Sequence, residues 1–247
     1  MCCEVMRVSL RAFGAGVPYF ATVLMLVTML MVSVSRAANP SDGWLSYAVY
    51  RAPNETDVIT RLSATMIVPD DSHGGTPAFW FGVQTAHGDG ALIQPIMAKW
   101  TGVDYNMFQE IFDWTDGQDE QTDGVHVRPG DVIDASVAYV EPRRYIMNMT
   151  CRSSGKQSNY HYDLLPEQKA TESVAYFVLE HQPFLCHELP RNGKCSWTNI
   201  SVEVNGSPVP DALFQAKQEN PKCGSRAVVH SPSSIDIEWV AASSIVA

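Results

Sequence analysis

Short apolar or alternating runs, separated by turn-forming residues, fill the chain from Trp44 onward and constrain its fold more than any other feature. Alternation with a period of two is typical of half-buried β-strands, and no run shows the 3.6-residue period of a helix. Turn chemistry lies between the runs, for example at Gly88-Asp89-Gly90 and Pro129-Gly130-Asp131. The expected strands are residues 44–50, 59–68, 78–85, 91–100, 107–114, 132–140, 144–150, 159–165, 173–181, 197–204, 226–231 and 235–241.

Strands of this number and spacing predict an all-β, two-sheet antiparallel β-sandwich. A short helix is predicted near residues 210–219, where Asp211 is a suitable N-terminal cap. The chain contains no repeat and no linker long enough to separate domains, so residues 38–247 are expected to form one domain.

Residues 1–37 are expected to direct export. Arg7 and Arg11 precede the uncharged stretch 12–34, and Ser35-Arg36-Ala37 offers small residues to a signal peptidase. The apolar stretch is also long enough to span a bilayer, so an uncleaved signal anchor through residues 12–34 stays an alternative. In both cases the domain is expected to be secreted, extracellular or lumenal, with membrane contact only through a retained anchor.

The acidic balance of the chain restricts its partners. Seventeen basic and 27 acidic residues give a net charge of −10. The segment 1–37 carries three arginines and one glutamate, so its removal lowers the net charge to −12. An acidic surface of this size argues against nucleic acid and against anionic membranes as partners.

Four cysteines lie outside the N-terminal segment, at positions 151, 186, 195 and 223. Four cysteines in an exported chain predict two disulfides, for which three pairings are possible. Turn formers between Cys186 and Cys195 favour a Cys186–Cys195 bridge, which leaves Cys151 to pair with Cys223. Four glycosylation sequons, at Asn54, Asn148, Asn199 and Asn205, agree with passage through a glycosylating compartment.

Gln94 is unusual because it lies inside the apolar run 91–100 and is followed by Pro95. An unpaired buried amide costs about 1–3 kcal/mol, so Gln94 is expected to have partners, to face water, or to act on a ligand. In a strand it shares a face with Leu92, Ile96, Ala98 and Trp100. Aromatic side chains with a few polar groups on one face are typical of a polymer-binding cleft and also of an ordinary core edge.

The acidic stretch 110–123 offers no recognised carboxylate site. Glycosidases need two carboxylates facing one another, but Glu110 and Asp113 are three residues apart and point to opposite faces of a strand. Asp119, Gln121 and Asp123 resemble the start of a calcium loop, whose twelfth position would be Gly130. Neither a metal site nor a cofactor is therefore expected.

Eight short segments occur in a fixed order along residues 44–180: Trp44-Leu45-Ser46-Tyr47, Leu62 to Pro69, Trp80-Phe81-Gly82-Val83, Ala91-Leu92-Ile93-Gln94, Phe112-Asp113-Trp114, Gly130 to Ile133, Asn148-Met149-Thr150 and Ala175 to Glu180. Together they resemble the ordered motifs of the glutamic peptidases (eqolisins) and their concanavalin-like sandwich relatives. The order and spacing are more specific than any single motif. The resemblance implies a concanavalin-like jelly roll with a concave cleft.

In that family, a glutamine and a facing glutamate form the catalytic dyad. The resemblance implies that Gln94 is the glutamine and puts Tyr176, whose ordinary pKa is near 10, where the glutamate would be. Glu180 matches a second glutamate of the motif and is the remaining candidate for the catalytic carboxylate. Glu180 and Glu172 both share the strand face of Tyr176, each displaced by about 13 Å at ~3.3 Å per residue. The implied cleft also contains Trp80, Trp100 and Asp113.

Three functions follow from these observations. The leading expectation is a degenerate homologue of acid glutamic endopeptidases that binds or acts on polypeptide in the cleft. An active acid endopeptidase with rearranged residues is an alternative, since a carboxylate reaching Gln94 would restore the pair. The alternative from another functional class is a non-catalytic, lectin-like module that binds carbohydrate or glycoprotein on the same face.

Overall fold

The computed structural model describes residues 43–70, 75–88, 90–99, 104–114, 117–164, 170–181 and 185–240. These residues belong to one compact unit, Asn39–Ala247. The expected export segment and Trp100 lie outside the described residues. Within the described ranges, no helix is long and apolar enough to cross a membrane.

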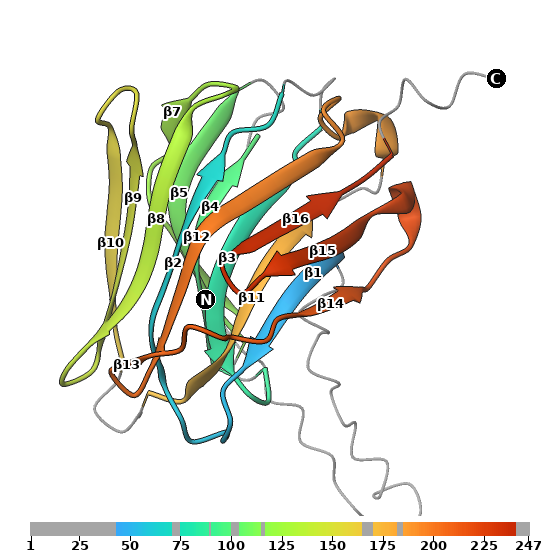
Figure 1. Ribbon diagram of the computed structural model, residues 1–247. Helices are drawn as coiled ribbons and strands as arrows, with labels where there is room; N and C mark the ends of the chain where they lie inside the picture. The colour runs from blue at the N-terminus through green and yellow to red at the C-terminus, as the bar shows by residue number, and fades with distance from the viewer. Residues whose placement is uncertain are drawn as a thin grey trace, which may run out of the picture. The chain divides into compact units, whose positions relative to one another are not determined.

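Two eight-stranded antiparallel sheets pack against each other, which confirms the predicted β-sandwich (Figure 1). The first, called here the β3 sheet, has the order β14-β1-β11-β3-β4-β5-β6, and β7 also pairs with β5. Its strands are β1 (Trp44–Arg51), β3 (Ala78–Thr85), β4 (Ala91–Ala98), β5 (Tyr105–Asp113), β6 (Gln118–Gln121), β7 (Val125–Val127), β11 (Glu172–Glu180) and β14 (Gln215–Gln218).

The second sheet, called here the β12 sheet, has the order β10-β9-β8-β2-β12-β16-β15, and β13 pairs with β12. Its strands are β2 (Ile59–Ile67), β8 (Val132–Val140), β9 (Arg144–Cys151), β10 (Gln157–Asp163), β12 (Lys194–Val204), β13 (Ser207–Pro208), β15 (Arg226–Ser231) and β16 (Ser234–Glu238).

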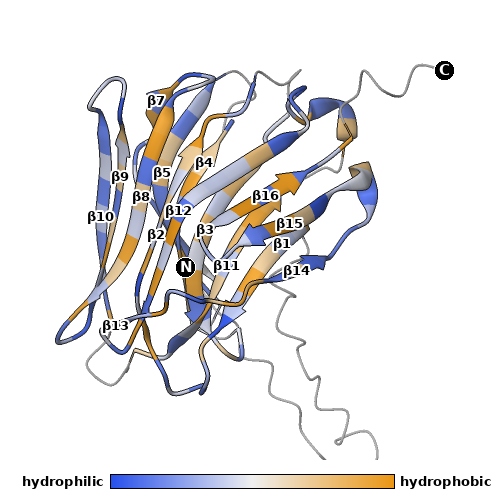
Figure 2. Ribbon diagram, in the orientation of Figure 1, coloured by the Kyte–Doolittle hydropathy of each residue, from blue (hydrophilic) through white to orange (hydrophobic). Residues whose placement is uncertain are grey.

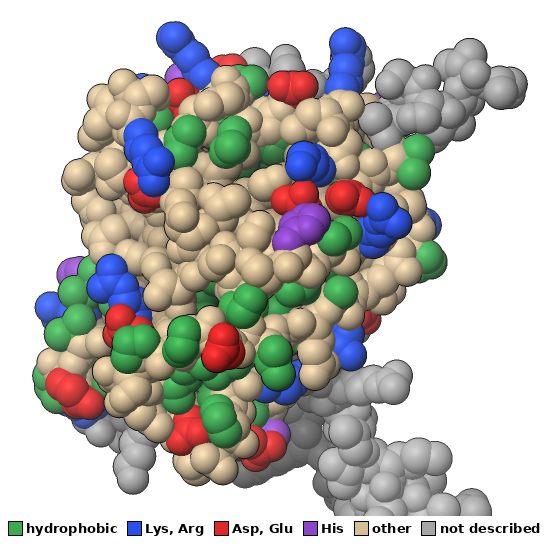
Figure 3. Space-filling view, viewed as in Figure 1, with side chains coloured by type: hydrophobic (Ala, Val, Ile, Leu, Met, Phe, Trp, Pro, Cys, Tyr) green, Lys and Arg blue, Asp and Glu red, His purple; other side chains and the backbone are tan. Residues whose placement is uncertain are grey.

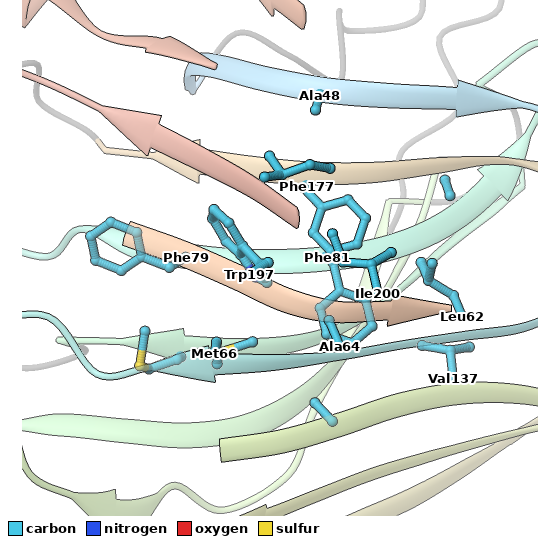
Figure 4. Close-up of a cluster of buried hydrophobic side chains, with 14 of the residues drawn as sticks. Ala48, Leu62, Ala64, Met66, Phe79, Phe81, Val137, Phe177, Trp197 and Ile200 are labelled. Carbon is cyan, nitrogen blue, oxygen red and sulfur yellow. The ribbon is translucent and has the colours of Figure 1, made fainter. Parts of the chain in front are cut away.

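The core lies between the two sheets, where alternate residues of each strand meet. Hydrophobic and hydrophilic residues alternate along the strands, as period-two patterning requires (Figure 2). Phe177 of β11 stacks on Phe81 of β3 at 5.4 Å between ring centroids and meets Trp197 of β12 edge-on at 5.8 Å (Figure 4). Truncating such a buried aromatic to alanine costs about 3–5 kcal/mol, so these contacts hold the sheets together.

The predicted helix near residues 210–219 is wrong. Residues 215–218 form β14, which pairs with β1 through Ser46 opposite Gln218 and Val49 opposite Gln215. The edge of β1 would otherwise expose unpaired backbone groups, and this pairing outweighs the local helical tendency. Among the described residues, helical turns are limited to two short 3₁₀ segments, η1 (Cys186–Glu188) and η2 (Lys222–Gly224).

The predicted disulfide pairing is also wrong. Cys186 of η1 bonds to Cys223 of η2, with 5.1 Å between the Cα atoms. Cys195 and Cys151 are free and buried. Alternation along β12 directs Cys195 into the inter-sheet core, where it stays unbonded, although the backbone does turn at Gly193.

The outer face of the β12 sheet carries charged side chains beside scattered hydrophobic ones (Figure 3). Two guanidinium nitrogens of Arg152 donate to the two carboxylate oxygens of Asp134 at 2.6 and 2.7 Å. Asn148 and Asn199, two of the sequon residues, line the same shallow hollow as this ion pair. Its hydroxyl, amide and charged groups are suited to contact with water, unlike the outer face of the β3 sheet.

Candidate functional site

The outer face of the β3 sheet carries a second hydrophobic cluster, separate from the inter-sheet core. On β4, Ile93 and Met97 belong to the core, whereas Leu92, Ile96 and Ala98 belong to this outer cluster. The buried members are Trp44, Trp80, Leu92, Ile96, Ala98, Phe108 and Val178, and Tyr47, Ala78 and Tyr176 pack against them.

A polar row crosses this face on five neighbouring strands. The register places Tyr176 opposite Gly82, Gln94 opposite Glu110, and Glu110 opposite Gln121. Gly82 and Gln94 are neighbours as well, because the pairs on either side, Trp80 with Ile96 and Val83 with Ile93, have the same register. The row therefore runs Tyr176, Gly82, Gln94, Glu110, Gln121.

Gly82 leaves a bare stretch of backbone between Tyr176 and Gln94. A Cβ atom at this position would lie 2.6 Å from the Ile93 carbonyl oxygen and 3.1 Å from the Gln94 Cβ. No side chain fits there without moving β3 away from β4. Between positions 176 and 94, the row therefore contains backbone alone.

Gln94 is 3% exposed and finds its partner on β5, where the sequence suggested none. Its Nε2 donates to Glu110 Oε1 at 2.7 Å, and Nε2 of Gln121 donates to Glu110 Oε2 at 2.7 Å. Gln121 also donates to Asp119 at 3.0 Å. The Oε1 atom of Gln94 is buried and receives no hydrogen bond. The amide nitrogen of Gln94 therefore has a hydrogen-bond partner, while its amide oxygen can accept a hydrogen bond from a ligand.

Burial raises the pKa of Glu110 to about 8, and the nearby negative charges of Asp119 and Glu180 act in the same direction. The hydrogen bond from Gln121 opposes this shift. Since burial disfavours the charged form of a carboxyl group, Glu110 carries a proton through the acidic and neutral range. The Gln94–Glu110 pair is therefore an amide against a neutral carboxyl group below pH 8.

Glu180, at the end of β11, accepts a hydrogen bond from Trp80 Nε1 at 3.1 Å. Burial raises its pKa as well, and the Trp80 bond only partly offsets this effect. Glu180 lies opposite Ala78 of β3, whereas Tyr176 lies opposite Gly82, so Glu180 is outside the polar row. The expected catalytic pairing of Gln94 with Glu180 has no direct contact in the structure.

Glu172 lies on the other side of the sheet from Gln94, which corrects the expectation that it shares the face of Tyr176. A register shift between Glu172 and Val174 interrupts the alternation of β11. Glu172 accepts hydrogen bonds from the Tyr145 hydroxyl of β9 and from the Thr171 amide, between the sheets. The bulge therefore removes one of the carboxylates that the sequence offered to the cleft.

Glu110 and Glu180 line the same pocket, which has a volume of about 300 Å³. The pocket lies beside the polar row, toward the β11 end that carries Glu180. Small side chains at Ala78 and Ala98 leave room between the two carboxyl groups. The remaining lining residues are Thr76, Ile96, Phe108 and His181.

The predicted cleft residues are only partly brought together. Trp80 and Tyr176 lie on the outer face with Gln94 and belong to the same cluster or pack against it. Asp113 ends β5 and points to the same side of the strand as Ile111, a core residue, so it does not share the face of Glu110.

Gln121 was not predicted as a site residue because its polar stretch resembles a turn rather than a strand. The residue patterns of β4 and β5 are compatible with their pairing, and that pairing would have identified Glu110 as the partner of Gln94.

Comparison with known proteins agrees with this geometry. A family model described as the peptidase A4 family matches residues 46–239. The chain is similar to solved scytalido-glutamic peptidase with a transition-state analogue inhibitor, at 18% identity and TM-score 0.60, covering 81% of this chain and 99% of that one. No curated protein sequence matches.

Two further solved structures share the fold. One is an eqolisin, SCP-B, in complex with the tripeptide Ala-Ile-His, at 18% identity and TM-score 0.56, covering 80% of this chain and 98% of that one. The other is aspergilloglutamic peptidase from Aspergillus niger, at 16% identity and TM-score 0.52, covering 67% and 99%.

Proposed function

Because the chain belongs to the peptidase A4 family, we propose that it holds a polypeptide on the outer face of the β3 sheet and lacks the family's acid hydrolysis. The polar row is the observation that supports this proposal most strongly. Tyr176 stands across bare Gly82 from Gln94, at the position where the resemblance puts the catalytic glutamate. A phenol in place of a carboxylate leaves Gln94 without a base on that side.

The carboxyl group on the other side of Gln94 does not replace the base at acidic pH. A general base must be deprotonated and within hydrogen-bond reach of the proton it removes. Glu110 is within reach but has a pKa of about 8, and burial raises the pKa of Glu180 too. Burial also raises the pKa of the Tyr176 phenol. Glu110 and the Tyr176 phenol therefore stay protonated between pH 2 and 5, and Glu180 makes no direct contact with Gln94.

Polypeptide binding is supported by the composition of the face and by its relatives. An extended chain offers backbone N–H groups, and Gln94 Oε1 is a buried acceptor without a donor. Trp44, Trp80 and Tyr176 form an aromatic floor, with Trp44 5.0 and 5.2 Å from the other two rings. Two similar structures were solved with a peptide-based transition-state analogue and with a tripeptide.

The test uses the purified chain with a reduced, carboxymethylated protein such as lactalbumin. We expect saturable binding and no new peptide termini by mass spectrometry between pH 2 and 5. Gln94→Ala is expected to weaken binding. Acid cleavage by the unmodified chain that disappears in Gln94→Ala would contradict the proposal. Binding to a glycan array but not to denatured protein would favour the lectin-like alternative.

Export and glycosylation belong to the same proposal. We expect secreted material to begin near Ala38 and to carry glycan on at least one of Asn54, Asn148, Asn199 and Asn205. The four asparagines lie on β9, on β12 or in turns, and none is on β3, β4, β5 or β11. Glycans would therefore leave the polar row uncovered. Intact-protein and peptide mass spectrometry check this, and a full-length, membrane-bound, unglycosylated chain would contradict it.

A further inference from the structure

We propose that the pocket between Glu110 and Glu180 receives one basic side chain, lysine or arginine, of the polypeptide held on this face. This inference rests on the proposed function and adds a residue preference to it. The pocket volume of about 300 Å³ is at the lower end of the ~300–1,000 Å³ typical of small-ligand sites. A single long side chain is the size of group that fits.

The pocket has walls for an aliphatic stem and acceptors for a charged end. Ala78, Ala98, Ile96 and Phe108 supply an apolar lining. Lysine and arginine side chains bury their methylene groups against such surfaces while their charged ends reach polar groups. Glu110 and Glu180 stand among these apolar walls as acceptors, so the lining matches both parts of a basic side chain.

Neither carboxyl group has a cation as partner among the described residues. Glu110 accepts from Gln94 and Gln121, and its charged neighbours are the acidic Asp119 and Glu180. Glu180 accepts from Trp80, its one hydrogen-bond donor within the described ranges. Buried carboxylates are normally paired with a cation or held neutral by a proton. Burial raises the pKa of both groups, and a basic side chain in the pocket is the partner that would stabilise their charged forms.

His181 lines the pocket but does not supply the missing charge. It is fully buried, and its Nε2 lies 3.1 Å from Glu188 Oε2. Burial lowers the pKa of His181, an effect larger than the opposing effect of Glu188. The imidazole is therefore neutral near pH 7, and its nearest acidic neighbour is Glu188 rather than either pocket carboxyl group.

A second, independent feature points to a ligand that donates hydrogen bonds. Gln94 is 3% exposed, and its Oε1 has no donor, although its amide nitrogen contacts Glu110 directly. A backbone N–H of the bound chain would satisfy this oxygen while the basic side chain lies near Glu110. A metal ion fits less well, because no group of three or more His, Cys, Asp or Glu side chains in the described part of the chain can hold one.

The experiment measures binding of denatured lactalbumin in two forms, one with free lysines and arginines and one with both blocked. At pH 7.5 we expect the unblocked form to bind at least tenfold more tightly. Glu180→Gln keeps the side-chain shape and is expected to remove this difference, and Ala98→Leu is expected to remove it by filling the pocket. Glu141→Gln, an exposed carboxyl group in the turn after β8, removes the same charge and is the matched control.

The outcomes separate the two proposals. Equal binding of both forms, or a tenfold preference that survives Glu180→Gln, would overturn the basic-side-chain pocket and leave polypeptide binding intact. Failure of both forms to bind would overturn the proposed function itself, and this inference with it. An equal loss of preference in Glu180→Gln and Glu141→Gln would assign the effect to the overall acidic charge and overturn the pocket.

Discussion

Replacing Tyr176 by glutamate is expected to give the protein acid-dependent hydrolysis of denatured polypeptides. The new carboxylate would extend across Gly82 toward Gln94, since Gly82 places no side chain between the two positions. A positioned general base contributes ~10²–10⁴-fold to such a reaction, so cleavage at pH 3–4 is expected to rise by about this factor over the unmodified chain. Peptide termini counted by mass spectrometry give the rate.

The variant removes an aromatic contact, so folding must be checked beside activity. Tyr176 meets Trp44 at 5.2 Å and Tyr47 at 5.9 Å between ring centroids. Losing these contacts is expected to lower the free energy of unfolding by about 1–3 kcal/mol. Tyr176→Gln is the matched control, since it has nearly the same shape as glutamate and no ionisable group. A folded, polypeptide-binding Tyr176→Glu variant without acid hydrolysis would mean that more than the carboxylate is missing.

Much of the fold follows from alternation, which is a local property of the sequence. Residues 132–140 and 144–151 show it clearly, because only one face of each strand is buried, whereas residues 91–98 are buried on both faces. The strands that sequence reasoning missed are short, and β6 (QDEQ) and β14 (QAKQ) are also polar. They form because a neighbouring strand edge needs hydrogen-bond partners, and that need is not visible in their own residues.

The candidate site was accessible to sequence reasoning only in part. Gln94 is identifiable as a candidate from the sequence, because an amide inside an apolar run requires a hydrogen-bond partner. Its partner, Glu110, depends on how β4 pairs with β5, and a shift of one residue would place Glu110 on the other face. Glu172 shows the opposite failure, because simple counting placed it on the Gln94 face and a bulge turned it inward.

The pairing of the cysteines failed for a related reason. Turn formers between Cys186 and Cys195 bring the backbone segments close, but a disulfide also requires the Cβ atoms to point at each other. Cys195 lies on β12 as a free thiol, whereas η1 and η2 lie together and bring Cys186 to Cys223. The elements that the fold brings together, rather than separation along the chain, decide the bond.

The folded protein is expected to lose stability as the pH rises from about 4.5 to about 8, chiefly through Glu110. Its pKa is about 8 in the folded protein against a usual value of 4.5. Below pH 4.5 the group is protonated in both states and its contribution is fully present. Between the two values the unfolded chain releases the proton while the folded protein retains it, so each pH unit costs about 1.4 kcal/mol. The total loss is on the order of 5 kcal/mol.

Glu110→Gln is expected to flatten this decline, because the substituted amide does not titrate. Its Oε1 can still accept from Gln94, but its nitrogen faces the Gln121 donor, so Gln121 must turn its amide over at a cost that does not depend on pH. Urea unfolding from pH 4.5 to 9 gives the slopes, and Glu141→Gln serves as the exposed control. The pKa values of Glu172 and Glu180 are also raised by burial and leave a residual slope of the same sign.

Identical slopes in Glu110→Gln and the unmodified chain would show that Glu110 ionises freely in the folded state. An ionised Glu110 beside Gln94 could then act as a base at acidic pH, and the case for a chain without acid hydrolysis would fail.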